Sequence, residues 1–238
     1  MRFHLYCAYV PADQLVAVAV EAERLGYDAL SLPDHVVHPV HLATPYPYTA
    51  DGAPPWSAQD EWPDPIVAAA AMAARTERIE FITGVYVLAL RHPLLVAKAL
   101  ATLDVLSGGR FALGVGAGWM REEFAALDTP FARRGARLDE ALAVLRAMWA
   151  GPASFEGEHF AFAELSMRPR PRRPLRILAG GHSAAALRRA ARLCYGLITP
   201  LTSAAETARY VRGGAGASVL VLRRRGAEPG GAAPRGAA

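Results

Sequence analysis

An aspartate and a histidine stand side by side where an apolar segment ends. Asp34 and His35 follow the run ALSL closely, and His38 and His41 continue at a spacing of three. Histidine exchanges a proton near neutral pH, so His35 can serve as an acid or a base. The spacing also suggests metal ligands, but Pro39 interrupts the helix that would align the imidazoles. We therefore predict a proton-transfer site without a metal ion, and ordinary polar packing of the pair is the alternative.

A cluster of glycines marks a second place where a ligand can approach the backbone. Gly114, Gly116 and Gly118 alternate with other residues after the run RFAL. A dinucleotide-binding fingerprint requires its third glycine at the position where this chain has Trp119. The cluster therefore indicates tight turns or close approach of a ligand, and it argues against a Rossmann phosphate loop.

Two further glycine sites lie at or near the ends of predicted strands. Gly180 and Gly181 precede Ser183, which can cap the next helix, and the free N–H groups at a helix start attract anions. An ordinary turn is the alternative. Gly84 interrupts the strand-like run ITGVY, which indicates a bulge, either structural or pressed against a ligand.

Alternating strands and helices are expected to position these residues. Apolar and β-branched runs predict seven strands, and amphipathic or alanine-rich stretches predict the helices between them. The strands are expected over 3–7, 27–32, 79–88, 110–116, 175–181, 196–200 and 217–223, and the helices over 12–26, 63–77, 93–107, 136–151, 183–193 and 203–213. Repeated βα units favour a doubly wound sheet or a (β/α)8 barrel. Ligands bind at the carboxyl ends of the strands in both, so one site can collect all the clusters above.

Three segments interrupt this rhythm. The insertion 35–62 is rich in Pro, Tyr and Trp, and a loop of this length in a compact domain is usually functional. We expect it to cap the substrate pocket, with packing on the surface as the alternative. Its candidate side chains are Tyr46, Tyr48, Trp56 and Trp62. A hairpin is predicted over 155–162, and 223–238 is expected to be a disordered tail after a single domain over 1–222.

The composition limits the classes of function. The 238 residues carry a net charge of +4 and 53% hydrophobic side chains, which is enough for a large core. The arginine clusters at 168–173 and 223–225 lack interleaved aromatic residues, so nucleic-acid binding is not expected. No apolar run is long enough to span a membrane and no signal-peptide pattern is present, so a cytoplasmic protein is expected. Cys7 and Cys194 are interpreted as buried thiols of a reducing compartment.

Several motifs in unbroken order resemble the luciferase-like monooxygenase superfamily, most closely its F420-dependent oxidoreductase branch. They are AERLGYDALSLPDH at 22–35, RTERIEFITGVYVLALRHPLLVAKALATLDVLSGGRFALGVGAGWMREEF at 75–124, RRGARLDEALAVLRAMWAG at 133–151, FEGEHFAF at 155–162 and LRILAGGHSAAALRRAARL at 175–193. The resemblance implies a (β/α)8 TIM barrel with a deazaflavin, or FMN, across the carboxyl ends of the strands. It also implies a homodimer and a small organic substrate.

The resemblance also implies roles for single residues. Asp34 would contact the deazaflavin, and His35 would be the acid or base beside the site of hydride transfer. Gly84–Val85 would form a cis peptide bond that supports the ring, with Thr83 before it. Gly180, Gly181 and His182 would bind the cofactor phosphate, and the glycine cluster from Gly114 to Gly118, with Gly116 at its centre, would line the floor of the site.

We therefore expect an oxidoreductase that moves a hydride between coenzyme F420 and a small organic molecule. The alternatives are an FMN-dependent monooxygenase and a non-catalytic paralogue that only binds cofactor. The chain departs from the family pattern at Cys194–Tyr195, where relatives usually have Ala-Asp. Only about seven strands are predicted, so the barrel is expected to be incomplete at its C-terminal side.

Overall fold

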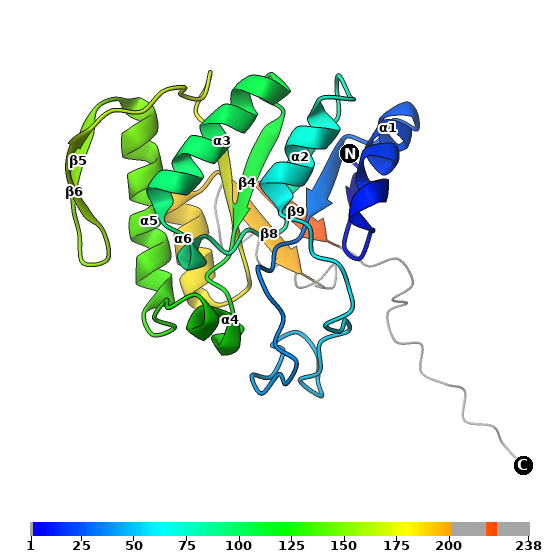
Figure 1. Ribbon diagram of the computed structural model, residues 1–238, viewed down its shortest axis with the longest axis horizontal. Coiled ribbons are helices and arrows are strands. Elements are labelled where there is room, and N and C mark those ends of the chain that lie inside the picture. Colours follow the sequence, from blue (N-terminus) through cyan, green and yellow to red (C-terminus); the bar gives the residue numbers. More distant parts are fainter. Residues whose placement is uncertain (1, 201–217, 223–238) are drawn as a thin grey trace, which may run out of the picture.

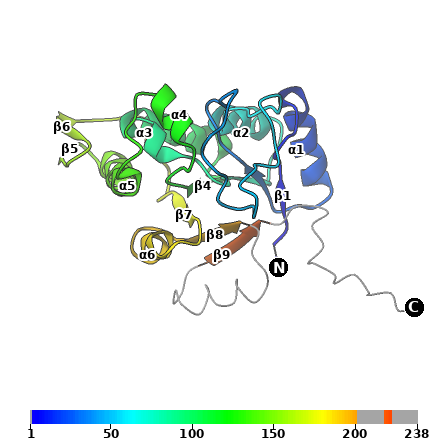
Figure 2. The same cartoon turned by 90° about the horizontal axis from the view of Figure 1, so that it is seen from below.

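A curled, fully parallel sheet forms the centre of the molecule. The structure is a computed structural model that describes residues 2–200 and 218–222. The described strands of the main sheet follow the order β1 (His4–Tyr6), β2 (Ala29–Leu32), β3 (Glu80–Thr83), β4 (Phe111–Val115), β7 (Arg176–Gly180), β8 (Gly196–Pro200) and β9 (Ser218–Leu222). Figure 2 shows these strands as an arc. The expected incomplete barrel is therefore confirmed.

Helices cover the outer side of this arc. They are α1 (Leu15–Arg24), α2 (Pro65–Ala73), α3 (Pro93–Ser107), α5 (Arg134–Ala150) and α6 (Ala184–Leu193), with a short α4 (Arg121–Ala126). Short 3-10 turns occur at Ala12–Gln14 and Leu88–Leu90. Figure 2 shows α1, α2, α3 and α5 along the outer side, and α6 beside β7 and β8. Because outer helices join the parallel strands from β1 to β8, the carboxyl ends of these strands share one edge.

The helix ends follow the signals in the sequence. Asp64 caps α2 by accepting hydrogen bonds from the N–H groups of Ile66 and Val67. Ser183 caps α6, where its side chain accepts from Ala186 N–H. Gly26 and Gly108 take positive φ angles of 81° and 69° where α1 and α3 end, as their lack of a Cβ permits. These caps mark ends of four predicted helices, of which α3 has the predicted bounds and α1 and α2 are shorter than predicted.

The predicted hairpin is also present, as the separate antiparallel pair β5 (Ala153–Glu156) and β6 (Ala161–Leu165). The predicted strand over 79–88 was too long, because β3 ends at Thr83 and only an isolated bridge between Tyr86 and Val115 follows it. The helix α4 was not predicted. The predicted helix over 203–213 and the tail at 223–238 lie outside the described residues. Among the described residues, no helix combines the length and the apolar character needed to cross a membrane.

The inner face of the sheet explains one of the clustered glycines. A Cβ on Gly114 would lie 2.0 Å from the Thr83 carbonyl oxygen and 2.4 Å from Ile198 Cδ1. Ile82, Ala112, Leu178 and Ile198 pack together on that side of the sheet. Gly114 is therefore required by the packing of β3 against β4, and it does not line the cavity described below.

We predict that Gly114→Ala lowers the free energy of unfolding by ~3 kcal/mol, at the upper end of the range for overpacked cores. The loss is large because the new Cβ meets the Thr83 carbonyl, which belongs to the backbone of β3 and cannot move aside. The measurement is urea unfolding followed by circular dichroism. Gly151→Ala is the matched control, since nothing lies within 4 Å of its added Cβ. Equal stability of the two variants would contradict this assignment.

Candidate active site

A cavity of about 540 Å³ opens at the carboxyl edge of the sheet. Its size falls within the range typical of small-molecule and cofactor sites. Of the residues predicted for the site, the cavity lining includes Asp34, His35, Gly84, Val85, Gly116, Gly180, Gly181 and His182. Segments that are far apart in the sequence therefore meet at one mouth, as the parallel topology predicts. Thr83 and Gly114 are the predicted residues that the lining does not include.

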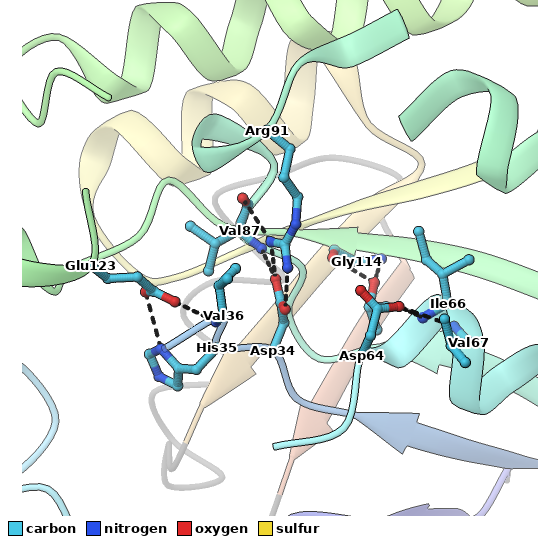
Figure 3. A network of polar contacts seen from close by, with 11 residues as sticks. Asp34, His35, Val36, Asp64, Ile66, Val67, Val87, Arg91, Gly114 and Glu123 are labelled. Atoms are coloured by element: carbon cyan, nitrogen blue, oxygen red, sulfur yellow. Dashed lines mark hydrogen bonds and ion pairs between the residues drawn. The ribbon is translucent and has the colours of Figure 1, made fainter. Parts of the chain in front are cut away.

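Asp34 is held in a buried ion pair rather than left free for a ligand. Its two carboxylate oxygens accept hydrogen bonds from Arg91 Nη1 and Nη2 at 2.6 and 2.8 Å (Figure 3). The N–H of Val87 donates to the same carboxylate at 2.8 Å. Burial raises the pKa of Asp34, and Arg91 and the Val87 N–H oppose that rise. The guanidinium also lies over the Tyr86 ring at 4.2 Å, which fixes the segment that follows β3.

His35 is oriented by a buried glutamate. Its Nδ1 lies 3.2 Å from Glu123 Oε2, and the other oxygen of Glu123 accepts from Val36 N–H at 2.5 Å (Figure 3). Both side chains are almost completely buried, with 7% and 1% of their surfaces exposed. Because a carboxylate accepts, the pair assigns the proton of the neutral imidazole to Nδ1 and leaves the lone pair on Nε2. His35 can then accept a proton at Nε2 while Glu123 stabilises the resulting charge.

The segment after β3 has the unusual backbone that the resemblance implied. The peptide bond between Gly84 and Val85 is cis. The Val85 side chain fills a space made by two glycines, since a Cβ on Gly116 or Gly180 would lie 2.6 or 2.4 Å from its methyl groups. Thr83 is fully buried behind this segment, where its hydroxyl donates to the Gly114 carbonyl at 2.7 Å. Thr83 therefore joins β3 to β4 and does not reach the cavity.

The N-terminus of α6 closes one end of the cavity. Gly181 has a φ of 111°, and its N–H donates to the Ile198 carbonyl at 3.1 Å, so this N–H is not available to a phosphate. The cavity lining continues through Ser183, Ala185 and Ala186 into the first turn of the helix. The Ala186 N–H donates to the Ser183 hydroxyl, so the N–H groups of Ala184 and Ala185 are the ones that have no partner within the helix. An anion at this end would therefore be held by α6 rather than by the amide of Gly181.

The 35–62 loop folds over the mouth of the cavity. Its four candidate aromatic side chains, Tyr46, Tyr48, Trp56 and Trp62, all line the cavity. The rings of Trp62 and Trp56 lie 4.7 and 5.8 Å from the His35 ring, and Tyr48 lies 5.4 Å from His182 at the opposite end. Figure 1 shows this loop, in blue and cyan, on the same side of the sheet as α4. The loop thus spans the cavity from His35 to the start of α6.

Glu122 fastens this loop to α4. Its carboxylate accepts hydrogen bonds from Ala43 N–H, Thr44 N–H and the Thr44 hydroxyl at 2.8 to 2.9 Å. Burial alone would raise its pKa, but these hydrogen bonds and one from its own N–H outweigh it and lower the pKa of Glu122 to about 2. A lowered carboxyl pKa adds stability that is complete above the ordinary value of 4.5 and is lost as pH falls toward 2.

We predict that Glu122→Gln speeds amide hydrogen exchange at residues 43 and 44. The NH₂ group of glutamine cannot accept a hydrogen bond, so it cannot replace the carboxylate oxygen that accepts from the N–H and hydroxyl groups of the loop. In the unaltered protein the protection should persist to about pH 4, below the ordinary carboxyl pKa. Glu156→Gln is the control, since Glu156 is exposed on β5 and makes no side-chain hydrogen bond to the described residues. Unchanged exchange in Glu122→Gln would show that Glu122 does not hold the loop.

The chain resembles known proteins along most of its length. A family model described as luciferase-like monooxygenase matches residues 1–219. The chain belongs to this family. A mycobacterial relative, an uncharacterized protein of Mycobacterium tuberculosis, is 37% identical over 193 residues, which are 81% of this chain and 67% of the relative. An F420-dependent glucose-6-phosphate dehydrogenase of Beutenbergia cavernae is 34% identical over 80% of this chain and 53% of its own length.

Solved structures of the luciferase-like type share the fold. A monooxygenase from Streptomyces bottropensis has 26% sequence identity and a TM-score of 0.73, and the match covers 89% of this chain and 64% of that chain. An F420-dependent secondary alcohol dehydrogenase in complex with an F420-acetone adduct has 18% identity and a TM-score of 0.73. That match covers 93% of this chain and 68% of the dehydrogenase chain. This luciferase-like chain therefore spans about half to two thirds of the length of the relatives that it matches.

The sequence analysis missed Tyr9 and Trp119 of the cavity lining, and it also missed Glu123 and Arg91, which hold His35 and Asp34. Glu123 lies in the motif REEF, where two adjacent glutamates follow the fourth strand. That position was a signal for a role at the cavity, but only the fold shows that Glu123 turns inward while Glu122 turns to the loop. Arg91 gave no signal beyond its place ahead of α3.

The histidines that suggested a metal do not gather. His38 bonds through Nδ1 to the Pro39 carbonyl, and His41 is exposed. Within residues 2–200 and 218–222, the one group with ligand atoms close together is Glu140, Glu158 and His159 beside the β5–β6 hairpin. Glu140 there accepts hydrogen bonds from the N–H groups of residues 158–160 and so holds the hairpin turn.

Proposed function

We propose that the chain is an F420-dependent oxidoreductase acting on a small organic molecule, with His35 as the acid or base. The observation that carries the proposal is the buried His35–Glu123 pair at one end of a cavity whose other end is the start of α6. One end can exchange a proton, and the other can hold an anionic tail. The homodimer implied by the resemblance stays a prediction.

The cavity fits a deazaflavin cofactor by its shape and donors. Gly116 and Gly180 have no Cβ, so the Val85 side chain packs closely against both of them in the cavity wall. A flat ring can then lie against the cis peptide segment at Gly84–Val85. The N–H groups in the first turn of α6 suit a phosphate, and the α6 dipole adds to the attraction. Asp34 lines the same wall with its carboxylate fixed by Arg91. Bound F420 would accept or supply the hydride.

His35 would complete the reaction by moving the proton. For an alcohol substrate, His35 would take the hydroxyl proton at Nε2 while bound F420 would accept the hydride from the carbon, and a carbonyl product would remain. In the reverse direction the imidazolium returns the proton to the carbonyl oxygen. Glu123 stabilises the charged ring in both directions, because its carboxylate accepts from Nδ1. The aromatic side chains of the 35–62 loop would exclude water from this transfer.

The relatives support F420 and also define the alternative. The dehydrogenases of Microbacterium testaceum and Beutenbergia cavernae are named for F420, at 32% and 34% identity. A type II Baeyer–Villiger monooxygenase in complex with FMN shares the fold, with a TM-score of 0.70 at 18% identity. FMN also carries a phosphate that the start of α6 would suit. The choice between F420 and FMN therefore needs a direct measurement.

The test is a parallel titration of the full chain with F420 and with FMN, followed by cofactor fluorescence. We expect saturable binding of F420 with a Kd at least about tenfold lower than that of FMN. A tenfold ratio corresponds to a difference of about 1.4 kcal/mol in binding free energy. Ala185→Asp places a negative charge in the first turn of α6 and should weaken F420 binding roughly tenfold by repelling its phosphate. Ala17→Asp makes the same change in the first turn of α1, which does not line the cavity, and should have no effect.

Other results would overturn the proposal. Tighter binding of FMN would favour the monooxygenase alternative. Binding of F420 with no hydride transfer to any alcohol or carbonyl tested would favour a paralogue that only binds cofactor. Equal losses of F420 affinity in Ala185→Asp and Ala17→Asp would show that the start of α6 does not bind the cofactor phosphate.

A further inference from the structure

Five aromatic rings surround His35 and form what we call the aromatic enclosure: Tyr9, Tyr46, Trp56, Trp62 and Trp119. The three indole rings lie 4.7 to 6.0 Å from the imidazole, measured between ring centroids. Tyr46 contacts Trp56 and Trp119, and Tyr9 contacts Trp56 and Trp62. Rings held edge to face in this way present planar, apolar walls to whatever occupies the space beside His35.

Three of the charged side chains that line the cavity are held in ion pairs. Asp34 is bound by Arg91, Arg133 by Glu158, and Arg189 by Asp139. Arg134 donates to the Gly118 carbonyl at 2.9 Å and lies over the Phe131 ring at 3.8 Å. Among the described residues, Arg134 is thus the lining cation without a carboxylate partner, and its guanidinium is held against Phe131, which does not line the cavity. The carboxylate of Glu123 lies beside His35, and it would repel an anionic group of a substrate placed there.

Two hydrogen-bond donors of the enclosure lack partners. The indole N–H groups of Trp56 and Trp62 are buried and make no hydrogen bond to the described residues. Buried donors without partners are costly, and most are satisfied in native proteins. A hydroxyl or carbonyl oxygen of a ligand beside His35 would supply the missing acceptor. A neutral oxygen suffices here, because no charged partner accompanies the two N–H groups.

We infer that the substrate of this site is an uncharged molecule with a planar, apolar ring next to a hydroxyl or carbonyl group, and not a phosphorylated sugar. The inference rests on the proposed function for the position of the cofactor. The ring would stack within the aromatic enclosure, and its oxygen would lie between His35 and the free indole N–H groups. The aromatic enclosure thus indicates the class of substrate, whereas the glycines beside Val85 and the start of α6 indicate the class of cofactor.

The test is direct ligand binding, followed by tryptophan fluorescence of the full chain. Three of the four tryptophans line the cavity, and Trp149, whose Nε1–H donates to Ala97 O, is removed by Trp149→Phe to lower the background. The probes are phenylethanol, cyclohexylethanol and glucose 6-phosphate, each with and without F420. We expect phenylethanol to bind at least about threefold more tightly than cyclohexylethanol, because aromatic stacking adds to burial. Glucose 6-phosphate should cause no saturable change.

Variants within the enclosure sharpen the test. Trp62→Leu keeps an apolar wall but removes the ring and N–H, so the preference for phenylethanol over cyclohexylethanol should fall to about one. Trp149→Phe alone should leave that preference unchanged. Equal binding of the two alcohols, or tighter binding of glucose 6-phosphate, would overturn the inference even where F420 binds. Failure of F420 to bind, with the alcohol preference intact, would overturn the proposed function instead.

Discussion

Replacing His35 with asparagine is expected to lower hydride transfer to F420 by about 10²–10⁴-fold, the usual contribution of a general acid or base. The asparagine amide can occupy the place of Nδ1 and keep a hydrogen bond to Glu123, but it has no counterpart to Nε2. Binding of F420 should change by less than about twofold, since the phosphate and ring contacts lie elsewhere. The measurements are single-turnover absorbance at saturating cofactor and the F420 titration described above.

Two comparisons separate proton transfer from packing. Glu123→Gln keeps the size of the side chain but cannot stabilise a charged imidazole as well, so its rate should fall less than that of His35→Asn. His38→Asn is the matched control, because His38 lies in the same loop and does not line the cavity. A full rate in His35→Asn, or a loss of F420 affinity as large as its loss of rate, would contradict the acid–base role.

The place of the site was predictable because it depends only on local pattern and chain topology. Alternating βα units put the ends of successive strands on one edge, so Asp34, Gly84 and Gly180 had to lie near each other. The cap residues Asp64 and Ser183 fixed the starts of two helices through hydrogen bonds within three residues. Interactions of such short range leave a clear mark in the sequence.

The partners of the site residues were not predictable, because they come from distant segments. Glu123 reaches His35 across 88 residues, and Arg91 reaches Asp34 across 57. Which of two adjacent glutamates turns inward depends on how α4 sits against the 35–62 loop, and α4 itself was missed. Six residues are too few for a clear periodic pattern. Tertiary packing thus decides what charge surrounds each predicted side chain.

The glycines show the same division between position and role. Their places at the strand ends were predicted, but the expected reason was close approach of a ligand. At Gly114 the reason is packing of β3 on β4, and at Gly116 and Gly180 it is the side chain of Val85. A sequence shows that a Cβ is absent, and only the packed structure shows which atom fills the space.

Replacing Arg91 with methionine is expected to destabilise the protein by about 3–5 kcal/mol at neutral pH, the cost of leaving a buried charge without its partner. The Asp34 side chain has no exposed surface, and Arg91 supplies two of the three hydrogen bonds to it. Methionine keeps an apolar stem, which limits the loss of packing. The measurement is urea unfolding at several pH values, analysed as a two-state transition.

The pH dependence of this loss identifies its cause. Burial already raises the pKa of Asp34, and removal of Arg91 raises it further, so the folded variant favours the protonated carboxyl. A folded-state pKa above the unfolded value means that stability is present at low pH and is lost as pH rises through the folded pKa. The deficit of Arg91→Met should therefore shrink as pH falls toward the ordinary aspartate pKa of 3.8.

Two variants complete the argument that burial, rather than pairing itself, sets the size of this effect. Asp34→Asn in the Arg91→Met background should recover part of the loss at neutral pH, since an amide needs no countercharge. Arg24→Met breaks the exposed pair with Glu21, which has a similar two-point geometry, and should leave the unfolding midpoint almost unchanged. A deficit that stays constant with pH and persists in the double variant would assign the stabilisation to packing of Arg91 on Tyr86 instead.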